Sequence, residues 1–448
     1  MKDIHEMSLN RLIWPVFIEL ALQMLVGNID QVMLSQYSDT AVAAVGNANT
    51  LMAMVILVFN VISLATSIMV SQSLGAKDSN RTSRIYTLAI FVNLIASVVV
   101  AVVLAASVQG IFYLMQVPAQ LMADAVIYVR IVCIGIPVQA LLLTFSAIFR
   151  SNAMMKVTMK ISILYNIVNV IGNQILIKGV GSIPAMGASG VAISTLVSRC
   201  LGLVLTMYAF KQLIQNAKID FSLLRPFPKD LLKEMLHLGL PSAGENLSWN
   251  FAQLVSLSFI NTFGTAAITT RTYANMFAMF CYLYASAAGQ ATQVKVGYYI
   301  GAGDEDSACK TARSSLRVAA PVSLVMAILL FVLATPLYSL LSSDPEVLKW
   351  ARIIAFIEIF LEFGRAYNIV YVRSMQAAGD VIFPIVLGIS VQWIISVGLG
   401  FLLGIVMGWG LAGVWIGFAA DECLRAVICH IRWVKGDWRG KAVIAKKC

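Results

Sequence analysis

Long apolar runs, bounded by glycine, proline or charged residues, recur along the whole chain. Each run is long enough to cross a membrane as a helix, since a spanning helix needs about 20 mostly apolar residues. Twelve runs occur, at residues 12–36, 44–73, 86–108, 121–148, 158–179, 187–211, 233–261, 268–300, 314–341, 347–375, 381–405 and 410–434. The pattern predicts an all-α integral membrane protein with twelve transmembrane helices.

The composition excludes a water-soluble fold. Of the 448 residues, 59% are hydrophobic and 12% are charged, and the mean hydropathy is +0.84, whereas soluble domains carry roughly 25% charged residues. Twelve spans leave about 37 residues for each helix and its loop, so no large soluble domain is expected. The net charge is +10. In a membrane protein an excess of basic residues indicates mainly which loops face the cytoplasm, so we do not take it as evidence for nucleic acid binding and expect no nucleic acid partner.

Basic residues alternate between successive loops. The loops after spans one, three and eleven hold no Lys or Arg, whereas those after spans two, four and six and the tail past residue 430 are basic. By the positive-inside rule both termini are cytoplasmic, in a multi-pass protein that we assign to the bacterial inner (cytoplasmic) membrane. Lys178, Lys349 and Arg352 are exceptions on the predicted outer side.

The sequence offers little support for an enzyme. The seven cysteines are scattered and form no C-x-x-C, and the three histidines lie far apart, so neither a disulfide framework nor a metal site is expected. The chain contains no H-E-x-x-H, no G-x-S-x-G and no P-loop. We therefore predict no catalytic residues and no organic cofactor.

The chain contains an internal repeat. One constant shift along the sequence aligns polar and small residues of the two halves: Pro15 with Pro241, Glu19 with Glu245, Asn49 with Asn275, Thr66 with Thr292, Gly75-Ala76 with Gly301-Ala302, and Asp78 with Asp304. The repeat predicts two six-helix lobes related by pseudo-two-fold symmetry, with the substrate path near their interface. We expect an N-terminal lobe at 1–211, a cytoplasmic connector at 212–232 and a C-terminal lobe at 233–448.

Span one carries a polar face. Glu19, Gln23 and Asp30 follow one another at steps of four and seven residues, which places them within about 20° of one another around a helix. An ionisable side chain in a span costs at least a few kcal/mol and marks a functional site or a buried pair. Pro15 removes a backbone donor and predicts a bend in this helix, as Pro241 does in the second half.

Span five carries a stripe of amides. Asn166, Asn169 and Asn173 lie at steps of three and four residues. Three amides facing lipid would be costly, so we expect them to face protein or an aqueous cavity, where they can hold a carboxylate, an ion or water.

The second half differs in its charges. Glu245 occupies the place of Glu19, but Ser256 stands where Asp30 would be, so the halves are chemically unequal. Span ten presents Glu358, Glu362 and Arg365 on one face, and span twelve presents Asp421 and Arg425 at an i, i+4 spacing. Two interpretations stay open for these charges: contacts within a transport cavity, or the intrahelical pairs Glu362–Arg365 and Asp421–Arg425 that fix packing.

Asp30 has no basic residue within four positions. An unpaired carboxyl group that faces a low-dielectric cavity can load and release a proton near physiological pH. The same carboxylate attracts a cation, so that a proton and a cationic substrate compete for one charge. Antiport follows from that competition.

These residues resemble a known family. The pattern Pro15…Asn28-Ile-Asp30-Gln-Val-Met-Leu, followed by Ala41-Val-Ala-Ala-Val-Gly46, is similar to the MATE (multidrug and toxic compound extrusion) transporters of bacterial type. Further similar segments are Gly75-Ala76-x-Asp78 with its copy at Gly301, Arg373-Ser-Met-Gln-Ala-Ala-Gly379-Asp380, and Gly187-x-x-Gly190-Val-Ala-x-x-Thr195. The resemblance implies two lobes around a central cavity, and export of amphipathic, often cationic compounds driven by a proton or sodium gradient.

The resemblance also implies roles for single residues. Asp30 matches the first-helix acid implicated in coupling, Asn169 and Asn173 match positions hydrogen-bonded to that acid, and Thr195 matches a threonine of the same cavity. Two departures stand out. Asn173 takes a place where some members have an acid, and Trp249 stands where many sodium-coupled members have one, with Glu245 four residues earlier.

We therefore predict a monomeric antiporter that exports small amphipathic cations in exchange for protons, with sodium near Asp30 or Glu245 as the alternative coupling ion. The predicted coupling residues are Asp30, Asn169, Asn173 and Thr195, and the substrate candidates are Glu19, Gln23, Asn166, Glu245, Glu358, Glu362 and Arg365. Two other interpretations are a flippase for lipid-linked saccharides, which would call for basic cavities, and a membrane-embedded enzyme or receptor.

Overall fold

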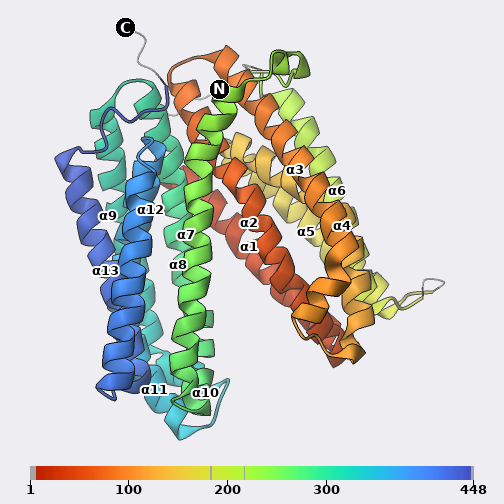
Figure 1. Ribbon diagram of the computed structural model, residues 1–448, viewed down its shortest axis with the longest axis vertical. Helices are drawn as coiled ribbons and strands as arrows, with labels where there is room; N and C mark the ends of the chain where they lie inside the picture. The colour runs from red at the N-terminus through yellow and green to blue at the C-terminus, as the bar shows by residue number, and fades with distance from the viewer. Residues whose placement is uncertain (1–6, 182–183, 216, 445–448) are drawn as a thin grey trace. The chain divides into compact units, whose positions relative to one another are not determined.

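The computed structural model describes residues 7–181, 184–215 and 217–444, and within these ranges it consists mainly of long helices joined by short loops (Figure 1). The two extreme ends, whose cytoplasmic placement the basic loops predict, lie outside the described residues. The helices of the first half are α1 (Leu9–Ser35), α2 (Asp39–Gly75), α3 (Ser79–Leu114), α4 (Ala119–Ser151), α5 (Met155–Lys178) and α6 (Gly187–Leu213).

The second half follows a short 3₁₀ turn at Phe221–Leu224. Its helices are α7 (Lys229–Asn261), α8 (Thr265–Gly301), α9 (Glu305–Val332), α10 (Ala334–Ser339), α11 (Pro345–Ala377), α12 (Ile382–Val391) and α13 (Gly410–Lys435). Helix α12 continues as two π-helical segments, Gln392–Leu399 and Leu402–Val406. If that continuation counts as one helix and the six-residue α10 is set aside, the described chain has twelve long helices, which confirms the predicted number.

The predicted ninth span is wrong in one detail. The sequence pattern indicates one apolar run at 314–341, but the structure ends α9 at Val332 and starts α10 at Ala334. Pro336 explains the interruption, because a proline has no N–H to donate to the carbonyl four residues earlier. The break at Leu333 leaves the short α10 beside the start of α11.

Eight helices are long and apolar enough to cross a membrane by length and composition, namely α1 to α6, α9 and the helix Ile382–Val406. The other four long helices, α7, α8, α11 and α13, do not reach this apolar content. Three of them bring ionisable residues to one cluster, described below, so their lower apolar content follows from what they bury.

The repeat found in the sequence extends to the helix ends. The offset that takes Pro15 to Pro241 also takes Asp39 to Thr265 and Ser151 to Ala377, so α2 matches α8 and α4 matches α11 at both ends. The shared Gly-Ala-x-Asp segment forms the same turn in both halves. Asp78 and Asp304 each accept a backbone N–H at 2.9 Å as the cap of the next helix, which satisfies a donor that the first turn leaves free.

The chain divides into two compact units. One is Ile18–Gly239, and the other combines the residues up to Phe17 with those from Leu240 onward. The boundaries lie inside α1 and α7, close to Pro15 and Pro241. In the first unit α4 packs against α2, α3 and α6, and in the second α11 packs against α8, α9 and α13.

The first turns of α1 and α7 each belong to the unit built mainly by the other half of the chain. At the start of α1, Phe17 contacts Tyr284 of α8 with ring centroids 5.7 Å apart, and the Lys295 ammonium donates to the Met7 carbonyl at 2.6 Å. At the start of α7, Glu234 pairs with Arg81 at 2.8 Å.

Candidate functional site

Helices α1, α5 and α6 enclose a polar track in the first unit. Helix α5 supplies a line of buried side chains: Thr158, Ser162, Asn166, Asn169 and Asn173. The amides are at most 8% exposed, as expected for groups that cannot face lipid. The two hydroxyl residues extend the amide stripe toward the start of α5. Sequence reasoning missed this extension, because Ser and Thr in helices commonly bond their own backbone and carry little signal.

Asp30 accepts hydrogen bonds from the amides of α5. Asn173 Nδ2 donates to Asp30 Oδ1 at 2.6 Å. The Asn169 amide satisfies both its ends when its nitrogen faces Asp30 Oδ1 at 3.2 Å and its oxygen accepts from the Thr195 hydroxyl at 3.2 Å and from the Thr195 backbone N–H at 3.3 Å. This orientation is assigned from the hydrogen-bond network. The four predicted coupling residues therefore lie together.

Asp30 has no ion-pair partner in the described part of the chain, where no Lys or Arg nitrogen lies within 4.0 Å of its carboxylate. Arg199 of α6 acts on it electrostatically from a greater distance. The side chain is partly exposed. Beside it, Asn173 Oδ1 is buried and has no hydrogen-bond donor in the described structure. Among the described residues the site thus contains one anionic group, the Asp30 carboxylate, and next to it one oxygen, Asn173 Oδ1, that accepts no hydrogen bond.

Glu19 has different surroundings, although it shares a face of α1 with Asp30. Its carboxylate lies 3.7 Å from Arg150 Nη1 and accepts the Thr158 hydroxyl at 3.0 Å, and the residue is 4% exposed. Gln23, between the two acids, is exposed and lies near the Tyr165 hydroxyl. The sequence did not predict that Arg150 pairs with Glu19, because Arg150 stands at the end of an apolar run, where a basic residue is expected in a cytoplasmic loop.

The second unit holds a cluster of carboxyl groups on α11 and α13. Both intrahelical pairs that the spacing allows are present: Glu362 with Arg365, and Asp421 with Arg425 at 2.8 Å. Glu358, buried beside them, accepts the Trp415 indole N–H at 2.7 Å. A cavity of about 20 Å³, large enough for about one water, borders Glu358.

Glu422 ties these pairs together. Its carboxylate lies 3.5 Å from Arg365 Nε and 3.4 Å from Arg425 Nη2, and it accepts the Asn368 amide at 2.7 Å. Sequence reasoning missed Glu422. Its i, i+3 spacing to Arg425 was a usable signal, but the contact with Arg365 crosses between helices and leaves no trace in spacing.

Glu245 of α7 belongs to the same unit. A Cβ on Gly388 would lie 2.8 Å from Glu245 Oε1 and 3.8 Å from Arg425 Nη1, so that glycine borders both charged groups. Arg373 also acts electrostatically on Glu245, so among the described residues five carboxyl groups of the cluster face three guanidinium groups. In the part of the chain that the structure describes, no group of three or more His, Cys, Asp or Glu is arranged to hold a metal ion.

Comparison with known proteins agrees with the fold and the repeat. The family model MatE matches the chain twice, at residues 15–175 and 241–402, and the two matches begin at the paired prolines Pro15 and Pro241. The uncharacterised transporter YisQ of Bacillus subtilis is 35% identical over 97% of this chain and 96% of its own length. A protein of Thermotoga maritima named probable multidrug resistance protein NorM is 23% identical over 98% of this chain and 94% of its own.

Solved structures share the whole architecture. The outward-facing conformation of a multidrug resistance MATE family transporter of the MOP superfamily superposes with a TM-score of 0.87 at 20% identity, covering 96% of both chains. A MOP superfamily transporter from Pyrococcus furiosus gives a TM-score of 0.86 at 19% identity, covering 96% of this chain and 95% of its own. With a family model matched over both halves and a relative 35% identical along nearly the full length, this chain belongs to the MATE family of membrane transporters.

Proposed function

We propose that this protein is a secondary antiporter that exports amphipathic organic cations in exchange for protons. Membership of a transporter family gives the general activity. Export of drugs is supported by relatives that are named probable multidrug resistance proteins. We assign it to the bacterial inner membrane, as a monomer with both termini in the cytoplasm.

The observation that carries the proposal is the setting of Asp30. Its carboxylate accepts a 2.6 Å hydrogen bond from Asn173 and has no cationic side chain within 4.0 Å in the described structure. A carboxylate that is hydrogen-bonded by amides, with Arg199 acting on it only from beyond 4.0 Å, is available to an incoming proton or cation, whereas a carboxylate in a close ion pair is not. Competition between the two for one carboxylate couples their movement in opposite directions.

The orphan oxygen of Asn173 suggests how the protonated state is accommodated. A protonated carboxyl group becomes a donor and needs an acceptor, and Asn173 Oδ1 is buried with no donor of its own. Rotation of the Asn173 amide would exchange an N–H donated to the carboxylate for an oxygen that accepts its proton. Both protonation states are then satisfied by one side chain.

The proposed cycle follows from these two states. In the state open to the outside, Asp30 takes a proton, the hydrogen bonds to Asn169 and Asn173 rearrange, α1 bends at Pro15, and the bound cation leaves. After access changes to the cytoplasm, proton loss restores the charge that attracts the next cation. Thr195 fixes the Asn169 amide throughout.

The remaining predicted substrate residues differ in whether they already form ion pairs. Gln23 is exposed and is proposed to contact substrate. Glu19, Glu362 and Arg365 already take part in ion pairs, so their proposed contribution is to hold the helices that line the path. Asn166, Glu245 and Glu358 remain proposed contacts with the substrate or with the cavity that holds it.

Sodium is the second candidate coupling ion, and one observation favours it. The buried Asn173 Oδ1 lies on the residue that bonds Asp30 Oδ1, so two oxygen ligands are close together. A sodium-coupled cycle would use the same aspartate.

The test is dye efflux from proteoliposomes under an imposed pH gradient, with and without sodium. We expect efflux of a cationic dye to follow the pH gradient without sodium, and Asp30→Asn to abolish it. Asp124→Asn, an exposed acid of α4, serves as the matched control and should retain efflux. Efflux that requires sodium and ignores the pH gradient would replace the proton by sodium, and full efflux by Asp30→Asn would remove Asp30 from the mechanism.

A further inference from the structure

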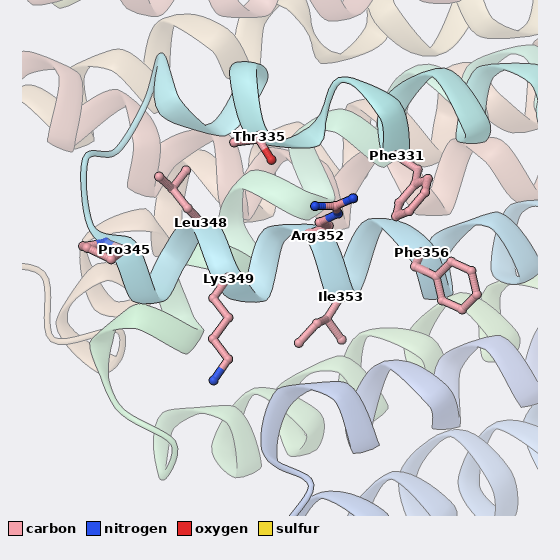
Figure 2. A pocket seen from close by; sticks show the side chains of 8 residues that line it. All are labelled: Phe331, Thr335, Pro345, Leu348, Lys349, Arg352, Ile353 and Phe356. Atoms are coloured by element: carbon pink, nitrogen blue, oxygen red, sulfur yellow. The ribbon is translucent and has the colours of Figure 1, made fainter.

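A groove lies on the second unit, between the α9–α10 break and the first turns of α11 (Figure 2). Its volume is about 650 Å³. Apolar side chains form most of its lining, with Phe331 on one wall and Ile353 and Phe356 on the other. Phe331, at the end of α9, contacts Phe356 of α11 with ring centroids 5.7 Å apart, so the two aromatic rings form one end of the groove. None of these residues takes part in the carboxyl cluster.

Two cations stand at the mouth of this groove. Lys349 and Arg352 are exposed and lie one turn apart on α11. In the part of the chain that the structure describes, neither has an acid within 4.0 Å, although Glu346 is three residues from Lys349. Figure 2 shows the Arg352 guanidinium beside Phe331 and Lys349 at the other edge. The groove therefore combines an apolar floor with uncompensated positive charge.

The depth of these residues in the bilayer follows from the length of α11. Its 33 residues span about 50 Å at 1.5 Å per residue, against a hydrocarbon core of about 30 Å, which leaves about 10 Å at each end. Arg352 is seven residues from the start of the helix, at about 10 Å, and so lies at the edge of the core. A helix centred in the bilayer and parallel to its normal would thus place Lys349 in the headgroup layer and Phe356 at the depth of the acyl chains.

We propose that this groove binds one anionic glycerophospholipid from the adjacent leaflet. Its phosphate pairs with Arg352 and Lys349, and an acyl chain covers Phe331, Ile353 and Phe356. A guanidinium at the phosphate level is well suited to bidentate contact with phosphate oxygens. A zwitterionic lipid fits less well, since it would bring its own ammonium group next to two unpaired cations. Snorkelling explains basic residues at this depth, but it does not explain an open apolar groove between them.

The occupant would stabilise the end of α11. Glu358 and Glu362 lie six and ten residues after Arg352 on the same helix, so a lipid that fixes the first turns of α11 also limits movement of the carboxyl cluster. This inference does not depend on the coupling ion or on the transported compound.

The test is native mass spectrometry of the purified full chain with added lipid. We expect phosphatidylglycerol to remain bound in preference to phosphatidylethanolamine with the same acyl chains. Lys349→Gln with Arg352→Gln should lower the bound phosphatidylglycerol roughly tenfold or more, because each basic residue near a membrane surface contributes about 1 kcal/mol. The control pair Arg130→Gln with Lys178→Gln removes two cations elsewhere and should retain the lipid.

A third arm adds inorganic phosphate as a competitor. If the groove binds the lipid, phosphate at equal concentration leaves the bound lipid unchanged; complete displacement by phosphate would indicate a simple anion site and overturn the proposal. Equal retention of the two lipids by the unmodified protein would also overturn it. That comparison needs no variant, so it decides the matter even if the double substitution fails to fold.

Discussion

The carboxylate of Glu19 lies 3.7 Å from the guanidinium of Arg150. Asp30, on the same face of the same helix, instead accepts the amide of Asn173 at 2.6 Å. Helical spacing places both acids on one face of α1 but does not show which side chains of other helices they meet. Both acids have a partner on α5, but among the described residues only Glu19 has a cationic partner, on α4. We therefore propose different tasks for the two acids.

We expect Glu19→Gln to lower stability and to leave coupling intact. The glutamine keeps an acceptor for Thr158 but leaves Arg150 without its anion, at a cost of about 1–3 kcal/mol. The thermal midpoint in detergent should fall, while proton-driven efflux per folded molecule stays near that of the unmodified protein. Asp30→Asn should give the opposite pair of results. Loss of efflux by Glu19→Gln at an unchanged midpoint would show that Glu19 takes part in transport.

We expect Asn173→Ala to slow proton-driven efflux by about tenfold or more, since a hydrogen bond to a charged group contributes about 1.5–3 kcal/mol. Asn93→Ala is a closely matched control. Asn93 is also fully buried, its Nδ2 donates to Thr144 at 2.7 Å, and its Oδ1, like that of Asn173, lacks a donor. Both variants should lose stability, but only Asn173→Ala should change the dependence of the efflux rate on external pH. The same pH profile for both would reduce Asn173 to a structural role.

The fold was largely predictable because the lengths of the apolar runs and the internal repeat can both be seen in the linear sequence. The constant shift between the halves, read from polar identities such as Glu19 with Glu245, also relates the ends of α2 to those of α8. The turn after Gly75 recurs after Gly301 because both need a cap at the aspartate that follows. Turns and caps of this kind depend only on residues close together in sequence, so the sequence predicts them.

The contacts between helices were less predictable. Glu422 meets Arg365 across 57 residues, and no helical spacing encodes that distance. The break after α9 was also missed. The apolar run at 314–341 continues on both sides of Pro336, so hydropathy predicted one uninterrupted helix. The amide stripe of α5 was predicted because its members share one helix, whereas its partners Thr195 and Asp30 come from two others.

We expect Glu422→Gln to destabilise the protein strongly. Its carboxylate is 15% exposed and is shared by Arg365 and Arg425. Removing one partner of a fully buried ion pair costs about 3–5 kcal/mol, and this partly exposed network should lose about 2–3 kcal/mol. Asp306→Asn is the control, because that acid is 82% exposed where it meets Arg439 and an exposed pair contributes at most about 1 kcal/mol. Thermal midpoints of both variants, measured in one detergent, should separate clearly. Equal midpoints would mean that the two arginines do not depend on Glu422.

Two glycines of α7 should respond in opposite ways to the same substitution. A Cβ on Gly239 would meet the backbone carbonyl oxygen of Val61 in α2, whereas a Cβ on Gly244 has nothing within 4 Å. Alanine is favoured over glycine in a helix by up to about 1 kcal/mol, so Gly244→Ala should raise the thermal midpoint slightly. Gly239→Ala must instead push two backbones apart, at a cost of about 1–3 kcal/mol.

The comparison tests how the start of α7 is held. Gly239 lies two residues before Pro241, where the helix already lacks a backbone hydrogen bond, so the segment has little means of absorbing the added carbon except by moving away from α2. A lower midpoint for Gly239→Ala, with a raised one for Gly244→Ala, is the expected result. If both alanines stabilise equally, the close approach of α7 to Val61 is not maintained in the folded protein.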